Sequence, residues 1–244
     1  MDLKGKNALI TGGSKRIGRE IVLGLAEHGC NVLIYYNSSK EEAEKLLQQA
    51  KSFGVKAEII KANLLDENQL VNLVNQSLNI FEHIDILINN ASIYYKKPLE
   101  EATFEDLEIF YEIHIKAPFY LSKEFGKIMY ERKEGRIINI IDYSAILPYK
   151  DFTPYSISKG GMITMTKAFA KEFAPYVLVN GILPGPIIPA EGLDELDEIE
   201  KPLQKTLLKK WAGGKEVFKA IKYLIETDFT TGALIPVEGG RLIF

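Results

Sequence analysis

The chain has little cysteine, no apolar run of membrane length and no concentration of charge of one sign. Its single cysteine, Cys30, excludes an internal disulfide. The first residues run directly into an apolar strand without the layout of a signal peptide, and no apolar stretch reaches the length that a bilayer requires. The formal net charge of −3 is spread without a basic block, so nothing attracts the protein to nucleic acid or anionic lipid. We therefore expect a cytoplasmic protein with neither nucleic acid nor membrane as a partner.

The composition is that of one globular domain. Of the 244 residues, 46% are hydrophobic and 26% charged, which is enough for a large buried core. No repeat or low-complexity linker divides the chain, so we expect a single domain over residues 1–244. Short β-branched or apolar runs alternate with longer amphipathic stretches. This alternation predicts an α/β fold in which helices cover both faces of a parallel sheet.

The same pattern gives approximate bounds for each element. The expected strands cover residues 8–11, 31–36, 57–61, 84–89, 136–141, 177–183 and 233–237. The expected helices cover residues 18–28, 41–53, 67–81, 104–132, 155–173 and 215–227. The only long irregular segment is residues 184–202, which contains the acidic run EGLDELDEIE. A loop of this length usually acts as a lid, so we interpret it as a substrate loop, with a plain surface loop as the alternative.

The segment ALITGGSKRIGREI has the order of strand, glycine-rich turn and helix start that a dinucleotide site requires. Glycines let the backbone approach a pyrophosphate, and the helix N-terminus offers unpaired N–H groups and a positive dipole end. The position of the turn in the first β–α–β unit makes the signal stronger than a lone glycine motif. The expected contacts in this turn are Gly12, Ser14, Lys15, Arg16, Ile17 and Gly18.

Two features favour NADPH over NADH as the dinucleotide. Lys15 and Arg16 place two cations in the turn, where they suit an additional 2′-phosphate. The second expected strand is followed by Asn37, Ser38 and Ser39, without the acidic residue that would hold a free ribose diol. The alternative is that the two cations only solvate the start of the helix.

Tyr155 and Lys159 are four residues apart, so a helix presents both side chains on one face. The Lys159 ammonium can then stabilise the Tyr155 phenolate and lower the pKa of the tyrosine. A lowered pKa would allow proton transfer near neutral pH. An isolated pair of this kind is usually structural, and it is the surrounding motifs that favour a catalytic role here.

Five stretches together resemble the short-chain dehydrogenase/reductase family: TGGSKRIG, INNAS, the Tyr155/Lys159 pair, VNGILPGP and TGALIPVEGG. The resemblance covers nearly the whole chain. It implies one doubly wound Rossmann domain with a seven-stranded parallel sheet, a dimer or tetramer of identical chains, and hydride transfer with a nicotinamide cofactor and no metal. It also implies that Lys159 holds the nicotinamide ribose. The further cofactor contacts that it implies are Asn37, Ser38, Ser39, Asn63, Leu64, Asn90, Ala91, Ser92, Tyr155, Pro184, Gly185 and Ile187.

Most members of that family have a serine thirteen residues before the tyrosine, and this chain has Asp142 there. A carboxylate about 4 Å from a developing alkoxide would repel it by roughly 4 kcal/mol at an effective dielectric constant near 20, which costs several hundred-fold or more in rate. Reduction of a C=N bond develops no alkoxide and needs a proton on nitrogen, which a carboxylate beside the tyrosine can relay. Two alternatives stay open: Ser144 takes the usual serine position, or a protonated Asp142 acts as the donor.

The pattern Asp-x12-Tyr-x3-Lys, together with Arg16, resembles the pteridine reductase branch of the family, which includes dihydromonapterin-type reductases. In NNASIYYKKPL, this resemblance aligns Tyr94 with an aromatic residue that stacks on the pterin, and Ser92 with a polar contact. Arg16 would reach the edge of the ring. The substrate contacts expected from the resemblance are Arg16, Ser92, Tyr94, Asp142 and Tyr155. A packing role for Tyr94 is the alternative.

His114 departs from the family pattern. It stands where the family has an asparagine that positions a water molecule for the proton relay. A histidine can also hold water, but its protonation would add a pH dependence, so we include His114 among the catalytic residues. A core or interface histidine without a catalytic part is the alternative. Asn63 is a second departure, since it replaces an aspartate that is usual near the adenine.

These observations predict an NADPH-dependent reductase acting on a pteridine, with Tyr155 as proton donor, Lys159 as its electrostatic partner and Asp142 as relay. The first alternative is a 3-oxoacyl-[acyl-carrier-protein] reductase or another carbonyl reductase. The second is a regulator that binds the cofactor without turnover, against which the intact Tyr155 and Lys159 argue.

Overall fold

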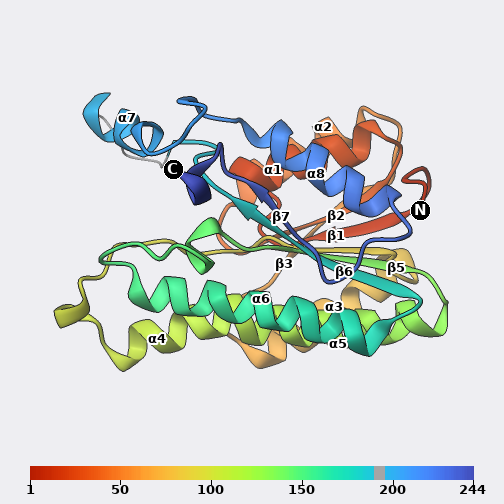
Figure 1. Cartoon of the computed structure of the whole chain (residues 1–244). Coiled ribbons are helices and arrows are strands. Elements are labelled where there is room, and N and C mark those ends of the chain that lie inside the picture. Colours follow the sequence, from red (N-terminus) through yellow and green to blue (C-terminus); the bar gives the residue numbers. More distant parts are fainter. Residues whose placement is uncertain (190–195) are drawn as a thin grey trace.

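Seven parallel strands form the centre of the fold in the computed structural model, which describes residues 1–189 and 196–244. Their order is β3-β2-β1-β4-β5-β6-β7, as expected for the doubly wound fold (Figure 1). The strands are β1 Asn7–Ile10, β2 Asn31–Tyr36, β3 Ala57–Lys61, β4 Ile86–Asn89, β5 Gly135–Ile140, β6 Val177–Pro184 and β7 Leu234–Val237. Strand order reverses between β1 and β4, and ligands of such sheets bind at the carboxyl ends beside this point.

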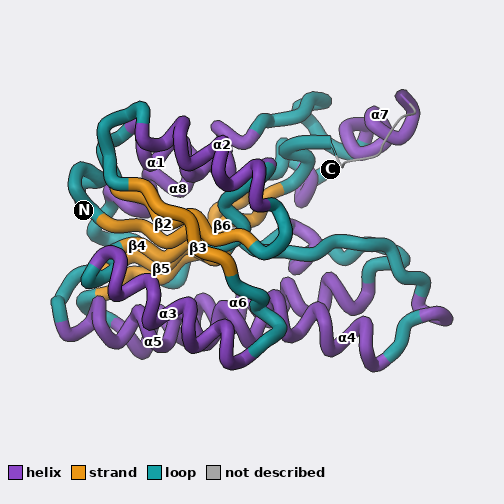
Figure 2. The backbone as a smooth tube through the Cα atoms, turned by 180° about the vertical axis from the view of Figure 1, so that it is seen from behind, coloured by secondary structure: helices purple, strands orange, loops and turns teal. Residues whose placement is uncertain are grey.

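Helices cover both faces of the sheet, which explains why β1, β4, β5 and β6 are buried along their whole length (Figures 1 and 2). Helices α1, α2 and α8 lie on one face, and α3, α5 and α6 lie on the other, each over its own hydrophobic core. The helices are α1 Arg16–Glu27, α2 Lys40–Lys51, α3 Glu67–Phe81, α4 Phe104–Tyr111, α5 Ala117–Glu131, α6 Thr153–Phe173, α7 Leu196–Gln204 and α8 Gly214–Glu226. Within the described ranges, no helix is both long and apolar enough to cross a membrane.

The prediction of a single α-helix over residues 104–132 is wrong in the middle of that range. Helix α4 ends at Tyr111, a π-helical turn spans Glu112–Lys116, and α5 follows. Pro118 has no N–H to bond the carbonyl four residues earlier, that of His114, so a continuous α-helical ladder is broken there. The Ala117 N–H instead bonds the Glu112 carbonyl, five residues back. Such π turns are frequent at functional sites, and this one carries His114.

The segment expected to be irregular over 184–202 also needs correction at both ends. Strand β6 includes Pro184, and helix α7 starts at Leu196. Pro202 lies inside α7, near its C-terminal end, and its missing N–H leaves out one hydrogen bond of the helix. The middle of the expected substrate loop, residues 190–195, lies outside the described residues. Elsewhere, the expected strand and helix bounds differ from the observed ones by two residues at most.

Candidate active site

The glycine turn after β1 is held by strand β4. Gly12 has a φ of +60°, and a Cβ atom there would lie 2.9 Å from the Ala91 Cα atom. The Asn90 side chain donates to the carbonyl oxygens of Thr11 and Gly12, at 3.0 and 2.9 Å. In return, the Thr11 hydroxyl accepts from the backbone N–H groups of Asn90 and Ala91. Asn90 was expected to contact the cofactor, and the structure uses its side chain to fix the turn.

The start of helix α1 closes onto the same turn. A Cβ atom on Gly18 would overlap the carbonyl oxygen of Gly12, so only glycine fits at this close approach. Ser14 is buried beside it, and Ile17 is partly buried against the core. The N-terminus of α1 therefore faces the space above the turn, which is the geometry that accepts a phosphate.

Arg16 and Lys15 form contacts that the sequence did not predict. Arg16 has a φ of +51°, and its guanidinium donates to the carbonyls of Pro189 and Ile188, at 2.7 and 3.0 Å. It therefore ties the glycine turn to the first part of the expected substrate loop. The Lys15 ammonium pairs with the Glu42 carboxylate of α2 at 2.9 Å.

A hollow of about 400 Å³ lies beside the turn. Its charged lining residues are Lys15, Arg16, Arg19, Lys45 and Glu42. Four cations and one carboxylate leave this hollow electropositive, which suits a phosphorylated nucleotide.

The other expected cofactor residues follow the carboxyl ends of the strands. Gly13 donates to the Tyr35 carbonyl, which places the segment after β2, with Asn37, Ser38 and Ser39, beside the turn. Beyond β3, the Asn63 side chain accepts from the Leu65 N–H at 3.1 Å.

Two of the expected contacts are buried, and two lie where β6 ends. The side chains of Leu64 and Ile187 are buried in the core, so only their backbones are available to a ligand. Pro184 ends β6, and Gly185 packs so closely on Glu238 that a Cβ atom would lie 2.6 Å from the Glu238 Cα atom. The roles of these residues toward a cofactor stay predictions.

Asp142 lies beside Tyr155, just beyond the end of β5. The Tyr155 hydroxyl donates to Asp142 Oδ2 at 3.1 Å. The other carboxylate oxygen accepts from the Ser144 N–H at 2.6 Å and from the Tyr149 hydroxyl at 3.3 Å. Ser144 is fully buried, and its hydroxyl has no hydrogen-bond partner among the described residues. The structure thus brings Asp142 to the tyrosine and leaves Ser144 in the interior, against the alternative that Ser144 takes the serine position.

The prediction that the pKa of Tyr155 is lowered is wrong, because the structure raises it. Burial raises the pKa of Tyr155 well above its ordinary value, and the Asp142 carboxylate raises it further. Lys159 is buried, its ammonium donates to the Ile140 carbonyl at 3.2 Å, and it lies 5.7 Å from the centre of the Tyr155 ring. A carboxylate in direct hydrogen bond therefore outweighs the more distant ammonium, and Tyr155 holds its proton.

The pKa values of Asp142 and Lys159 shift in opposite directions. Burial raises the pKa of Asp142, although hydrogen bonds from Ser144 and Tyr155 and the charge of Lys159 act against the rise. Burial lowers the pKa of Lys159 to about 8, and the Asp142 carboxylate opposes this fall. Both shifts favour the neutral forms, which makes a proton on Asp142 accessible nearer to neutral pH than in an exposed aspartate.

His114 is fully buried and joins two segments of the site. Its Nδ1 and Nε2 atoms lie 2.8 Å from the hydroxyls of Ser158 and Ser92, respectively. The Ser158 hydroxyl already donates to the Tyr155 carbonyl, so its oxygen must accept from a proton on Nδ1. Nε2 then accepts from the Ile93 N–H at 3.4 Å, and from the Ser92 hydroxyl when that proton is not given to the Ile93 carbonyl, 3.3 Å away.

This network assigns His114 the neutral form with the proton on Nδ1. Burial lowers the pKa of His114 well below its ordinary value, and the charge of Lys159 adds to the effect. The pH dependence expected from its protonation is therefore wrong. The observed contacts agree better with the alternative of a core histidine, here one that positions the loop after β4 against α6.

Aromatic side chains surround Tyr155. Tyr94 stacks on Phe152 with ring centres 4.8 Å apart and meets Tyr155 edge-on at 5.1 Å. The Tyr94 side chain is 54% exposed, so it has both a packing partner and an open surface. Tyr149 packs edge-on against Phe152 at 5.6 Å. The sequence analysis missed Tyr149 and Phe152, although the density of aromatics between Asp142 and Tyr155 was a usable signal.

Comparison with known proteins identifies the family. The sequence model of the short chain dehydrogenase family matches residues 6–198, and the chain belongs to this family of oxidoreductases, which use nicotinamide cofactors. An L-rhamnose 1-dehydrogenase (NADP(+)) of Thermoplasma acidophilum is 30% identical to it over 100% of this chain and 98% of the enzyme. A 3-oxoacyl-[acyl-carrier-protein] reductase of Synechocystis sp. is 32% identical over 99% of each chain. FolM alternative dihydrofolate reductase 1 from Brucella suis, solved in complex with NADP, has a TM-score of 0.92 and 30% identity, and the match covers 100% of this chain and 97% of that one.

Proposed function

We propose that this protein is an NADPH-dependent short-chain reductase that delivers a hydride and a proton to a C=N bond of a pteridine. The observation that carries the proposal is the 3.1 Å hydrogen bond from the Tyr155 hydroxyl to the Asp142 carboxylate. It supports a site in which Tyr155 and Asp142 exchange a proton that can be delivered to a substrate nitrogen.

The cofactor assignment rests on the glycine turn and the electropositive hollow beside it. Gly12 and Gly18 let the backbone and the α1 N-terminus approach a pyrophosphate, and Lys15 and Arg16 line the hollow that suits a 2′-phosphate. Two of the related proteins are described with NADP, which supports the same choice. NADPH, when bound, supplies the hydride.

The chain's own residues supply the proton. In the proposed relay, Tyr155 donates its proton to the substrate nitrogen and takes one from Asp142, so that no phenolate forms beside a carboxylate. The raised pKa of Asp142 makes its protonated form accessible, and the raised pKa of Tyr155 disfavours a route through the phenolate. The ammonium of Lys159 stabilises the carboxylate that is left.

The substrate ring would lie against Tyr94. This side chain is fixed by Phe152 on one side and touches Tyr155 by its edge, so it is positioned to stack on a flat heterocycle beside the proton donor. The loop after β4 also carries the Ser92 hydroxyl, which lies 2.8 Å from His114 Nε2. Arg16 is bound to the Ile188 and Pro189 carbonyls, so its contact with the substrate would require those bonds to exchange.

A carbonyl reductase is the second candidate. The similarity to the Synechocystis 3-oxoacyl-[acyl-carrier-protein] reductase favours it. It would require a protonated Asp142 to donate a hydrogen bond to the carbonyl oxygen, which the raised pKa of that carboxyl makes accessible.

We also propose that the protein forms a dimer or tetramer of identical chains. Large apolar side chains are exposed on α4, α5 and α6, including Phe104 at 86%, Phe119 at 49% and Ile157 at 60%. Pairing of these helices across a two-fold axis would bury them. Size-exclusion chromatography with light scattering tests this, and a monomeric mass at micromolar concentration would refute it.

A substrate comparison tests the function. The purified protein is assayed with NADPH against 7,8-dihydrobiopterin or dihydromonapterin, and separately against an acetoacetyl thioester. We expect kcat/KM for a pterin to exceed that for the thioester at least about tenfold. Turnover of the thioester alone would replace the pteridine proposal with the carbonyl reductase.

A further inference from the structure

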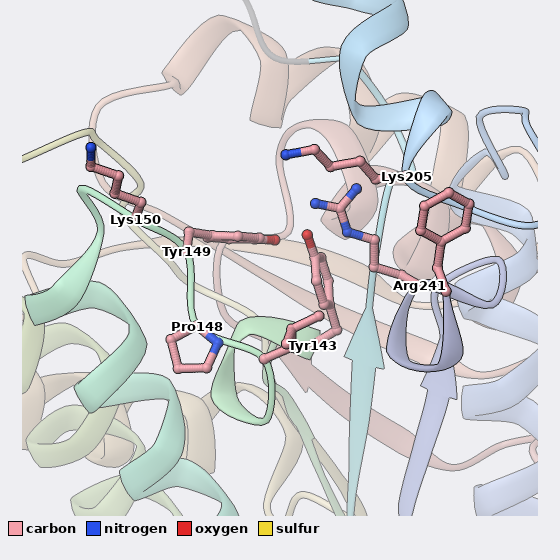
Figure 3. A pocket seen from close by; sticks show the side chains of 8 residues that line it. Tyr143, Pro148, Tyr149, Lys150, Lys205 and Arg241 are labelled. Atoms are coloured by element: carbon pink, nitrogen blue, oxygen red, sulfur yellow. The ribbon is translucent and has the colours of Figure 1, made fainter.

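A second hollow lies next to Asp142, since Tyr149 in its wall donates to that carboxylate. It measures about 470 Å³, and its walls come from the segment after β5, from the segment after α7 and from the 3₁₀ helix Arg241–Ile243. Figure 3 shows the Tyr143 and Tyr149 hydroxyls facing the Arg241 guanidinium and the Lys205 ammonium across this space. Lys150 lies on the far side, beyond Tyr149.

The charged side chains that line this hollow are all cationic. Lys150, Lys205 and Arg241 form no ion pair with a carboxylate of the described residues. Arg241 is nevertheless held in place, because it donates to the Pro202 carbonyl at 3.2 Å and packs over the Tyr143 ring at 5.3 Å. A fixed guanidinium beside the Tyr143 hydroxyl, with the Lys205 ammonium lining the same space (Figure 3), is a receptor for a carboxylate or a phosphate.

Two hydrogen bonds connect this hollow to the reaction centre. The Tyr149 hydroxyl, in its wall, donates to one oxygen of Asp142, and the Tyr155 hydroxyl donates to the other. Tyr143 directly follows Asp142 in the chain. A molecule whose ring lies at Tyr155 would therefore extend a substituent past Tyr149 toward Arg241.

We propose that this hollow, which we call the anion subsite (Tyr143, Tyr149, Lys205 and Arg241), binds a carboxylate or phosphate carried by the substrate. The inference rests on the proposed function, because it takes the reducible ring to lie at Tyr155. It adds that the substrate is an anion whose charge is separated from the ring by a short linker, and that the aromatic wall packs on this linker.

Matched substrates test the subsite. Dihydroneopterin and its monophosphate differ by a phosphate, and dihydrobiopterin and dihydrofolate differ by a side chain that carries carboxylates. We expect a KM about tenfold or more lower for the anionic member of at least one pair, since charge-assisted hydrogen bonds contribute at least this factor. The pair that shows the preference identifies phosphate or carboxylate as the anion. Equal KM values within both pairs would overturn the proposal.

Substitutions of the lining residues test whether the preference for anionic substrates arises in the anion subsite. Arg241→Gln and Lys205→Gln should each reduce the ratio of neutral to anionic KM about tenfold, whereas Lys210→Gln, a nearby exposed lysine outside the hollow, should keep the wild-type ratio. Lys205 is exposed, so its variant should fold normally, and thermal melting checks both variants. Equal losses for neutral and anionic substrates in both variants would overturn the proposal.

A binding measurement separates this inference from the proposed function. Calorimetric titration of the NADPH-loaded protein with p-aminobenzoylglutamate and with inorganic phosphate requires no turnover. If the wild type reduces no pterin but binds either probe and Arg241→Gln weakens that binding about tenfold, the subsite stands and the pteridine proposal fails. If pterins are reduced but neither probe binds and no matched pair differs, the subsite is refuted and the reaction stands.

Discussion

The glycine turn after β1 and the candidate catalytic centre after β5 lie at the same edge of the sheet but are held in different ways. The turn is fixed by backbone geometry: a positive φ at Gly12, close packing at Gly18 and carbonyls bound by Asn90. The catalytic centre is fixed by buried side chains whose charges act on one another, chiefly Asp142 and Tyr155. Steric changes should therefore disable the first region, and changes of charge should disable the second.

The largest expected effect is at Tyr155, the proposed proton donor. Tyr155→Phe removes the hydroxyl that bonds Asp142 while keeping a ring that packs against Tyr94. General acid catalysis contributes roughly a hundredfold to ten-thousandfold, so kcat should fall by at least about a hundredfold. Steady-state kinetics measures the loss, and fluorescence titration should give an NADPH affinity close to that of the wild type. An unchanged kcat would remove Tyr155 from the chemistry.

The glycine turn should respond to added volume. Gly18→Ala places a methyl group on the Gly12 carbonyl oxygen, and overpacking of this kind costs about 1–3 kcal/mol. The affinity for NADPH should fall at least about tenfold in a titration, with a lower midpoint of thermal unfolding.

Gly160→Ala is the matched control for that steric argument. The nearest atom to a Cβ on Gly160 is the Ala145 carbonyl oxygen at 4.0 Å, and Gly160 lies within α6, where alanine is favoured by about 0.5–1 kcal/mol. This variant should melt at or above the wild-type temperature. Equal destabilisation by the two substitutions would show that the close approach at Gly18 is unimportant.

The charge of Asp142 should set the pH dependence. Because burial raises the pKa of Asp142, its protonated form persists to higher pH than in an exposed aspartate, and it is lost as pH rises through that pKa. Under the proposed relay, kcat for a pterin then falls with rising pH over this range. Asp142→Asn cannot carry the proton, so its kcat should be about tenfold or more lower, without that fall. A wild-type profile retained in Asp142→Asn would assign the titration to another group.

Backbone geometry and side-chain charge also differ in how well a sequence reports them. The positions of the strands, the glycine turn and the Tyr155/Lys159 pair were predictable, because each depends on local periodicity or on spacing within one element. The pKa of Tyr155 was not, since its direction depends on the burial of the hydroxyl and on its contact with Asp142, both of which arise only in the folded chain. The contact of Arg16 with the Ile188 and Pro189 carbonyls joins segments far apart in the chain, and no local pattern encodes it.

Arg16 lines the hollow beside the glycine turn and also bonds the carbonyls of residues 188 and 189, and substitution can distinguish these two roles. If it serves the cofactor, Arg16→Gln should weaken NADPH binding about tenfold and leave NADH binding nearly as it was, since one charge-assisted contact with the 2′-phosphate is lost. Arg19→Gln, which alters another cation of the same hollow that pairs with Glu20, is the control and should have a smaller effect. Equal losses for both nucleotides would indicate that Arg16 acts by holding residues 188 and 189 in place.

The smallest expected effect on catalysis is at His114, where the family asparagine can be restored. His114→Asn cannot span the two 2.8 Å contacts with Ser92 and Ser158, so unfolding free energy should fall by about 1–3 kcal/mol. Because burial holds the pKa of His114 well below its ordinary value, the imidazole is neutral over the working range and the pH profile of kcat should not move. Nitrogen chemical shifts of the wild type should show a neutral ring protonated on Nδ1 between about pH 6 and pH 8, near the ordinary pKa of histidine. A ring that gains a charge in this range, or a pH profile that shifts in the variant, would return His114 to the proton relay and make the side-chain network of the catalytic centre responsive to pH.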